Sequence, residues 1–263
     1  MTQRIITFYR RYLKRRAYGW FGDYGSWQQA QQNCTGYDSS LILQKVKEAV
    51  LKVKNGKAVY ERDGVVFDTI EYSWPLLSAL LWVAVKNNGR LNVIDFGGSL
   101  GSTYFQNKKF LDSLGSVRWN IIEQENFVQT GRASVQDDTL RFYADINECI
   151  AQQGKPDILV LSCVMQYIEK PYDLISNIMV HDIRFIIIDN TPFNFVSKNR
   201  ITVQKVPPSI YTASYPCWFL DYKMVKESFE KKYTLVSEHE NDTRIELDGR
   251  SVQYKGFLLE LKK

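Results

Sequence analysis

The sequence has no long hydrophobic run, and few glycines and prolines for its length. Fifteen glycines and seven prolines among 263 residues exclude a collagen-like or low-complexity chain, and 44% hydrophobic residues argue against disorder. The longest nearly uninterrupted apolar stretch, 75–85, is shorter than the roughly 20 residues that cross a bilayer, so no transmembrane helix is expected. The basic N-terminus lacks the apolar core and cleavage site of a secretory signal, which predicts a cytoplasmic protein.

Paired cysteines and metal-ligand clusters are also missing. The four cysteines lie far apart, at Cys34, Cys149, Cys163 and Cys217, which suits reduced thiols better than disulfides or structural zinc. No group of His, Asp and Glu has metal-ligand spacing, so no metal is expected. The net charge of +5 is modest, and the basic residues gather near the N-terminus, so nucleic acid is not an expected partner.

Residues 1–90 are predicted to be a mostly helical N-terminal cap. Apolar residues recur at helical spacing over 5–13, with arginines between them. Such a basic amphipathic helix suits peripheral contact with an anionic membrane, or packing on its own domain or a neighbouring subunit. Further helices are expected over 39–54 and 74–86, the second with Pro75 in its first turn.

Residues 91–263 alternate short apolar runs with helical stretches. The runs cover 91–96, 119–123, 140–143, 157–163 and 184–189, and the helical stretches cover 102–114, 125–131, 146–153 and 172–180. This alternation predicts an α/β fold with a doubly wound, mostly parallel sheet. A hairpin of strands 234–240 and 256–261 should add an antiparallel strand. The segment 191–220 is expected to be a long functional loop.

An acid and three glycines follow the first of these strands, in Asp95-Phe96-Gly97-Gly98-Ser99-Leu100-Gly101. Glycines suit this bend because the backbone must turn sharply and let a ligand come close, which a Cβ would block. Open α/β sheets bind ligands at the C-terminal ends of their strands, so a ligand is expected here. Glycine-rich turns that merely tighten a connection are also common.

Polar residues end the next three strands. Glu123 follows Asp95 by 28 residues, near the length of one β-α-β unit, which places its carboxylate to bind ribose hydroxyls. The alternative for Glu123 is a solvated strand end. The third strand runs into Asp145, and the fourth ends in Ser162-Cys163.

The acid before the glycines helps to choose between cofactors. A dinucleotide site needs Gly-x-Gly-x-x-Gly, whose second glycine admits a pyrophosphate. Here the pattern is Gly97-Gly98-x-x-Gly101. The carboxylate of Asp95 would repel a pyrophosphate but attract the ammonium and sulfonium groups of S-adenosylmethionine. The methyl donor is therefore favoured over a nicotinamide or flavin cofactor.

Three segments resemble motifs of class I S-adenosylmethionine-dependent methyltransferases. They are the glycine loop 95–102, the strand 119–124 and the segment 161–167. More narrowly, Gly36-Tyr37-Asp38, Tyr60-Glu61-Arg62-Asp63, the same loop and 202–216 resemble a family of bacterial methyltransferases, assigned from sequence and often encoded in O-antigen and other surface-polysaccharide gene clusters. The resemblance covers roughly residues 27–260 and implies a Rossmann-like methyltransferase domain.

The resemblance also implies roles for the strand ends. Asp95 and the glycine amides would hold the methionine end of the donor, Glu123 the ribose, and Asp145 with the Ile146 backbone the adenine edge. Ser162 would lie below the sulfonium. Asp145 could instead cap the following helix. The expected cofactor-binding residues are Asp95, Gly97, Gly98, Ser99, Gly101, Glu123, Gln124, Asp145, Ile146 and Ser162.

The acceptor is expected beneath the 191–220 loop and the cap. Its predicted contacts are Tyr37, Glu61, Arg62, Tyr167, Tyr211 and Tyr215. Aromatic faces suit a sugar ring, although a small core under a loop would use the same aromatic residues, including Trp218 and Phe219. The triplet 61–63 could equally be a solvated turn.

A hydroxyl that attacks the methyl group benefits from a general base. Asp189, at the end of the fifth strand, is the predicted base, although it could merely partner the Asn190-Thr191 turn. Of the two histidines, His181 precedes the fifth strand, at the end of the sheet away from the ligand. His239 ends a later strand on the correct side but is expected near an edge.

These observations favour a metal-independent methyltransferase that acts on a sugar or nucleotide-linked sugar in surface-glycan synthesis. In-line displacement from a sulfonium depends largely on positioning. Two alternatives remain: a noncatalytic subunit that keeps the cofactor fold for assembly or membrane binding, and a nicotinamide-dependent sugar-modifying enzyme. The sequence makes no prediction of the oligomeric state.

Overall fold

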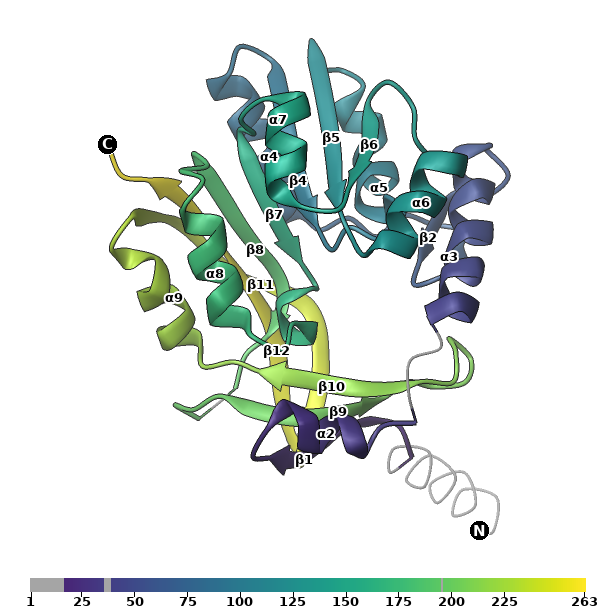
Figure 1. Ribbon diagram of the computed structural model, residues 1–263, viewed down its shortest axis with the longest axis vertical. Helices are drawn as coiled ribbons and strands as arrows, with labels where there is room; N and C mark the ends of the chain where they lie inside the picture. The colour runs from purple at the N-terminus through teal and green to yellow at the C-terminus, as the bar shows by residue number, and fades with distance from the viewer. Residues whose placement is uncertain (1–16, 36–38, 195) are drawn as a thin grey trace, which may run out of the picture.

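The computed structural model describes residues 17–35, 39–194 and 196–263 (Figure 1). The predicted basic helix near the N-terminus, and Tyr37 with its turn, lie outside these residues. A seven-stranded sheet with the order β11-β12-β8-β7-β4-β5-β6 forms the centre. Its parallel strands are β4 (Arg90–Phe96), β5 (Ser116–Ile122), β6 (Leu140–Tyr143), β7 (Ile158–Ser162) and β8 (Phe185–Pro192). The predicted α/β fold class is confirmed.

The C-terminal hairpin is antiparallel, as predicted, but longer. It consists of β11 (Tyr233–Leu247) and β12 (Arg250–Leu261), and β12 pairs with β8 in antiparallel register. Most residues between the two predicted strands therefore also belong to β11 or β12. The register of β12 against β8 shifts between Lys255 and Phe257, on either side of Gly256.

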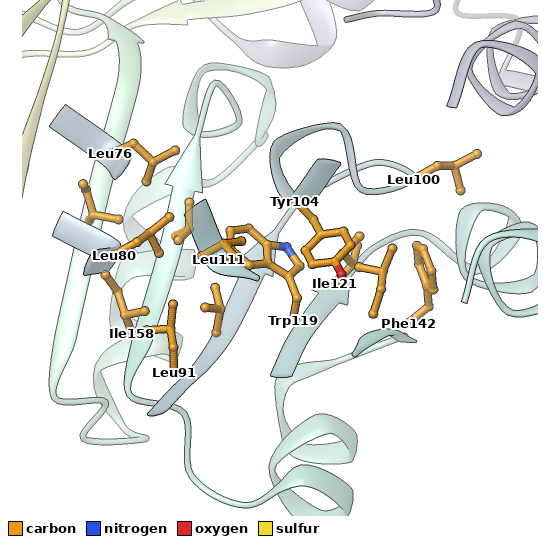
Figure 2. Close-up of a cluster of buried hydrophobic side chains, with 14 of the residues drawn as sticks. Leu76, Leu80, Leu91, Leu100, Tyr104, Leu111, Trp119, Ile121, Phe142 and Ile158 are labelled. Carbon is orange, nitrogen blue, oxygen red and sulfur yellow. The ribbon is translucent and has the colours of Figure 1, made fainter. Parts of the chain in front are cut away.

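Helices cover both faces of the parallel part of the sheet, and its central strands β4, β7 and β8 are buried on both sides, whereas the edge strand β11 is mostly exposed. They are α3 (Ser39–Lys54), α4 (Trp74–Lys86), α5 (Ser102–Leu111), α6 (Glu125–Ser134), α7 (Ile146–Gln153), α8 (Pro171–Met179) and α9 (Tyr222–Glu230). On β4, Val93 belongs to one buried cluster and Ile94 to another, because neighbouring strand residues point to opposite faces. The first cluster holds Trp119 of β5 together with Leu76 and Leu80 of α4 (Figure 2).

The segment 191–220 is not a loop, so that prediction was wrong. It forms β9 (Arg200–Lys205) and β10 (Ser214–Phe219), which join β1 (Gly19–Tyr24) in an antiparallel sheet with the order β1-β9-β10. Pro216 hid the strand from sequence reading, but β10 is an edge strand, where proline is tolerated. Figure 1 shows this small sheet beyond the ends of β7 and β8.

The N-terminal part contains strands as well as helices. Besides β1 it holds the short helix α2 (Trp27–Gln32) and the hairpin of β2 (Tyr60–Arg62) and β3 (Val65–Phe67). None of the helices in the described ranges has both the length and the hydrophobicity to cross a membrane. The four cysteines are free thiols, as predicted.

The strand order changes direction at β4, which defines where a ligand should bind. The chain continues from β4 to β5 and β6 on one side, while β7 and β8 lie on the other. Doubly wound sheets bind ligands at such a switch point, outside the C-terminal ends of the strands. The glycine loop after β4 and the end of β7 therefore mark the expected site.

Candidate active site

The glycine loop is a bend that side chains would block. Gly97 adopts φ 70° and Gly101 φ 98°, in the left-handed region that favours glycine. A Cβ on Gly97 would lie 2.3 Å from a methyl group of Val164, and one on Gly98 would lie 2.6 Å from the carboxyl carbon of Asp95. Space, as well as backbone conformation, therefore requires glycine at 97, and space requires it at 98.

Glu123 lies against this bend. Its carboxylate accepts hydrogen bonds from the backbone N–H of Ser99 at 3.2 Å and of Gln124 at 2.8 Å. Burial raises the pKa of Glu123, although both hydrogen bonds act in the opposite direction. The carboxylate is therefore anchored at the loop and is not simply a solvated strand end. Its contact with ribose stays a prediction.

Asp95 lies buried beneath the loop. The residue is 2% exposed, and its Oδ2 accepts a hydrogen bond from Trp119 Nε1 at 3.1 Å. Burial raises the pKa of Asp95 to about 7, the Trp119 bond opposes that rise, and the charge of Glu123 adds to it. The carboxyl group of Asp95 lies against Gly98, and a cation bound at the glycine loop would favour the charged form of Asp95.

Asp145 caps a helix, which was one of its two predicted roles. Its side chain accepts a hydrogen bond from the Glu148 N–H at 2.8 Å, at the first turn of α7. Ile146 follows as a buried residue. Contact of Asp145 and Ile146 with adenine remains a prediction.

Asp189 accepts hydrogen bonds from several parts of the chain. It is 1% exposed, and its oxygens accept from Ser162 Oγ at 3.1 Å, Ser73 Oγ at 3.2 Å and Asn241 Nδ2 at 3.1 Å. His239 Nε2 lies 2.9 Å from its Oδ1. The Asp189 side chain therefore does not merely stabilise the turn at 190–191 but joins several other segments of the chain.

Hydrogen bonds decide the charge of Asp189. Burial alone would raise its pKa, but the hydrogen bonds from His239, Asn241 and Ser162, together with the positive charge of His239 when it is protonated, outweigh burial and lower the pKa below its usual value. A buried carboxylate with a lowered pKa and every oxygen engaged is a weak proton acceptor. It is better suited to orient a neighbouring group.

The role of His239 was underestimated from the sequence. The prediction put it near an edge, and β11 is indeed the edge strand, but the side chain reaches back to Asp189. The single glycine within β12, Gly256, was the missed signal, because glycine inside a strand often marks a close approach. Ser73 and Asn241 carry no comparable sequence signal. His181 lies between α8 and the start of β8.

Tyrosines from distant segments meet near the ends of β7 and β10. The Tyr167 hydroxyl donates to Gln204 Oε1 at 2.9 Å, and its ring lies edge-on to Tyr215 at 5.3 Å. Burial raises the pKa of Tyr167, Tyr211 and Tyr215. Their hydroxyls therefore stay protonated and can donate hydrogen bonds.

Trp218 and Phe219 have structural roles. Trp218 stacks on Trp27 at 6.1 Å and donates to the Ile168 carbonyl at 3.0 Å. Phe219 is fully buried in a small cluster with Leu247. For these two residues the alternative of a small core, and not an acceptor surface, is confirmed.

The triplet 61–63 divides into a buried and an exposed part. Glu61 is 1% exposed and accepts hydrogen bonds from the Ser102 hydroxyl and from Gly64 N–H at 3.3 Å. Arg62 and Asp63 are exposed. Glu61 therefore fastens this hairpin to the helix that follows the glycine loop and is not part of a solvated turn.

Arg62 extends toward the strand ends. The side chain reaches solvent but is surrounded by protein, which lowers the pKa of its guanidinium; the interactions with Tyr60 and other acidic groups outweigh that effect and raise it. Cys163, just after β7, and Asp189, within β8, are among those groups. Arg62 thus lies within electrostatic range of Asp189 while keeping an exposed side chain.

A cleft of about 360 Å³ opens beside α4. Its lining comes from α4, β8, β11 and β12, at Pro75, Ser78, Ala79, Trp82, Ile187, Val236, Ser237, His239 and Leu258. The cleft therefore lies on the α4 face of the sheet, with His239 in its wall. Among the described residues, no group of three His, Cys, Asp or Glu side chains could hold a metal ion.

Comparison with known proteins gave structural neighbours only. No family model and no curated protein matches the chain. The N-terminal domain of EvdMO1, solved with SAH and D-fucose, shares 14% identity at a TM-score of 0.47, over 86% of this chain and 98% of that one. Magnesium protoporphyrin IX methyltransferase (ChlM) from Synechocystis PCC 6803, solved with SAH, shares 11% at 0.47, over 86% and 100%. The glycopeptide N-methyltransferase MtfA, solved with sinefungin, shares 12% at 0.46, over 70% and 92%. With identities and TM-scores this low, function has to be argued from the residues of the chain itself.

Proposed function

We propose that this protein is a metal-independent S-adenosylmethionine-dependent methyltransferase. The observation that carries the proposal is the anchoring of the Glu123 carboxylate at the glycine loop, 3.2 Å from Ser99 N. A bend without side chains is thereby joined to a carboxylate that can accept hydrogen bonds from two ribose hydroxyls. Asp95 below the bend adds a negative charge that suits a cationic ligand.

The residues at the switch point fit the donor. The glycine positions leave the space that a Cβ would fill, and Glu123 and Asp95 are arranged around it. When bound, the donor would supply an electrophilic methyl group on a sulfonium. The loop would fix its methionine end, Glu123 its ribose, and Ser162 would border the site at the end of β7. Positioning would provide most of the rate acceleration.

Calorimetry of the full chain with S-adenosylmethionine, S-adenosylhomocysteine and NAD⁺ tests this proposal. We expect both sulfur ligands to bind and NAD⁺ not to bind. Glu123→Gln should lower the affinity for S-adenosylmethionine and for S-adenosylhomocysteine by roughly 10- to 100-fold, since a charge-assisted hydrogen bond contributes about 1.5–3 kcal/mol. Glu125→Gln, at the exposed start of α6, is the matched control. No binding at millimolar ligand would refute the proposal, and binding of NAD⁺ alone would favour the nicotinamide alternative.

We further propose a hydroxyl-rich acceptor, a sugar or nucleotide-linked sugar of a surface glycan, methylated in the cytoplasm. Protonated tyrosine hydroxyls and aromatic faces suit a polyol, and exposed Arg62 could contact its phosphate or hydroxyls. Labelled donor incubated with nucleotide-linked hexoses, free hexosides, proteins and RNA provides the test. Label found only in protein or RNA would contradict a glycan acceptor.

A further inference from the structure

His239 reaches Asp189 by crossing a neighbouring strand. In the sheet order β11-β12-β8, the strand β12 separates the two residues, and His239 stands opposite Gly256. A Cβ on Gly256 would lie 2.4 Å from His239 Nε2 and 2.3 Å from the Ile188 carbonyl oxygen. The imidazole therefore lies directly over a position that only glycine leaves open.

The contact orients the imidazole. Asp189 is ionised, so the ring nitrogen beside it, Nε2, carries the proton of that hydrogen bond. Nδ1 of the neutral ring then holds a free electron pair. In the described part of the chain, Asp189 is the sole hydrogen-bond partner of the ring. The side chain keeps 12% of its surface exposed and borders the cleft beside α4.

The surroundings connect this pair to the donor site. Asp189 also accepts a hydrogen bond from Ser162, at the end of β7, and β7 is the direct neighbour of β4 with its glycine loop. The charged groups around the pair are Asp189 itself, Arg62 from β2, and the Glu240–Lys255 ion pair of 2.9 Å on β11 and β12. Imidazole and donor loop thus share one end of the sheet.

We propose that His239 is the general base of the methyl transfer and that Asp189 is its positioning residue. This inference rests on the proposed function. It replaces the sequence-based assignment of Asp189 as the base, because Asp189 is enclosed by hydrogen bonds whereas His239 offers a free nitrogen at a partly exposed edge.

The O–H bond of the acceptor breaks, and its proton bonds to Nδ1 of neutral His239. The oxygen electron pair bonds to the donor methyl carbon as the carbon–sulfur bond breaks, and sulfur keeps that pair as a neutral thioether. One positive charge therefore passes from sulfur to the imidazolium, next to the Asp189 carboxylate that stabilises it.

The test compares His239→Gln with His181→Gln, the matched variant at the only other histidine of the chain. Calorimetry with S-adenosylhomocysteine comes first: no binding to the unmodified protein would refute the proposed function itself. We expect both variants to bind this ligand as the unmodified protein does. With whichever nucleotide-linked hexose accepts label, His239→Gln should lower kcat by at least about 100-fold and remove the acid limb of the pH–rate profile. His181→Gln should change neither, and a His239→Gln variant with unchanged kcat and pH profile would overturn the inference.

A second measurement needs no acceptor. Nitrogen-15 spectra of the two imidazoles at pH 8, assigned with His181→Gln, should show the His239 ring protonated on Nε2 and free on Nδ1. Asp189→Asn should disturb this tautomer, and Ser73→Ala should leave it in place. A His239 ring protonated on both nitrogens at the pH of turnover, or one protonated on Nδ1, would overturn the inference.

Discussion

Two buried aspartates, at the ends of strands β4 and β8, differ in their surroundings. Asp95 is 2% exposed and Asp189 1%, yet the pKa of Asp95 rises to about 7 while that of Asp189 falls below its usual value. Asp95 accepts one hydrogen bond from a side chain, whereas Asp189 accepts from Ser73, Ser162 and Asn241 and faces His239. Burial raises the pKa of both carboxyl groups to begin with, so the difference between them comes from the number of hydrogen-bond donors and from the neighbouring charges of Glu123 and of His239 when it is protonated.

The two regions also differ in how the chain builds them. The donor region comes from neighbouring segments, a loop at 95–101 and a strand end at Glu123. The region proposed to accept the proton gathers Ser73, Asp189 and His239 from three distant parts of the chain. The first depends on local backbone conformation and the second on strand register. A substitution can therefore disrupt one of these two regions and leave the other intact.

Gly97→Ala should have the largest effect, confined to the donor region. The new Cβ would collide with Val164 at 2.3 Å and occupy φ 70°, so strain and overpacking together reach about 4 kcal/mol. We expect roughly 1,000-fold weaker binding of S-adenosylhomocysteine by calorimetry. Gly56→Ala, with φ 68° but open space, is the control, and equal losses in both variants would contradict a steric role for Gly97.

Gly256→Ala should break the other region. Its Cβ meets the Ile188 carbonyl at 2.3 Å and the His239 ring at 2.4 Å, so β12 or the imidazole must move, at a cost of about 2–3 kcal/mol in the free energy of unfolding. Denaturant unfolding measures the cost. Methyl transfer should fall with it while the affinity for S-adenosylhomocysteine stays constant. Gly249→Ala, in a turn with open space, should leave transfer intact.

Asp95 makes donor binding depend on pH. Because its folded pKa of about 7 lies above the ordinary 3.8, the folded protein binds an extra proton between these values, and its stability falls as pH rises through that window. A cationic donor favours the charged carboxylate, so affinity for S-adenosylmethionine should rise about tenfold from pH 6 to pH 8. In Asp95→Asn both dependences should vanish. An unchanged pH dependence in this variant would show that another group causes it.

For Asp189 the sign is opposite. A carboxylate with a lowered folded pKa stabilises the protein above the unfolded value, about 3.9, and that stabilisation is lost as pH falls through the folded pKa. Asp189→Asn should therefore destabilise at pH 7 by about 2–4 kcal/mol and progressively less in acid, measured by urea unfolding. If the difference in the free energy of unfolding between Asp189→Asn and the unmodified protein stayed constant from pH 7 to acid pH, the assignment of a charged Asp189 would be contradicted.

Tyr167→Phe should have the smallest effect and leave both regions intact. It removes one neutral hydrogen bond, to Gln204, worth about 1 kcal/mol. We expect an increase of about fivefold in acceptor KM with donor affinity unchanged. Tyr172→Phe, which loses a comparable bond to Asn199 away from the strand ends, is the control.

Sequence reasoning succeeded where local patterns decide the structure. The parallel strands and their helices agree with the structure within three residues at each boundary, because continuous apolar runs specify buried strands. The glycine loop and Glu123 come together because consecutive parallel strands end at one edge. The position of each residue within its β-α-β unit was sufficient to predict that the glycine loop and Glu123 lie close together.

It failed where partners are far apart in the chain. Sequence patterns predict a loop where β9 and β10 form a hairpin, because these strands are short and one contains Pro216. The contact between His239 and Asp189 depends on the register of β11 on β12 and of β12 on β8, which composition does not reveal. The bond from Ser102 to Glu61 likewise joins segments with no shared pattern.

The small sheet of β1, β9 and β10, which we propose to contribute to acceptor binding, is separate from the sheet that carries the glycine loop. Gln204, the partner of Tyr167, lies on the middle strand, paired with Trp20 on one side and Tyr215 on the other. None of these three strands takes part in the seven-stranded sheet that holds the glycine loop. Under the proposed function, substitutions in this small sheet would change the preferred acceptor during evolution while the donor site is inherited unaltered.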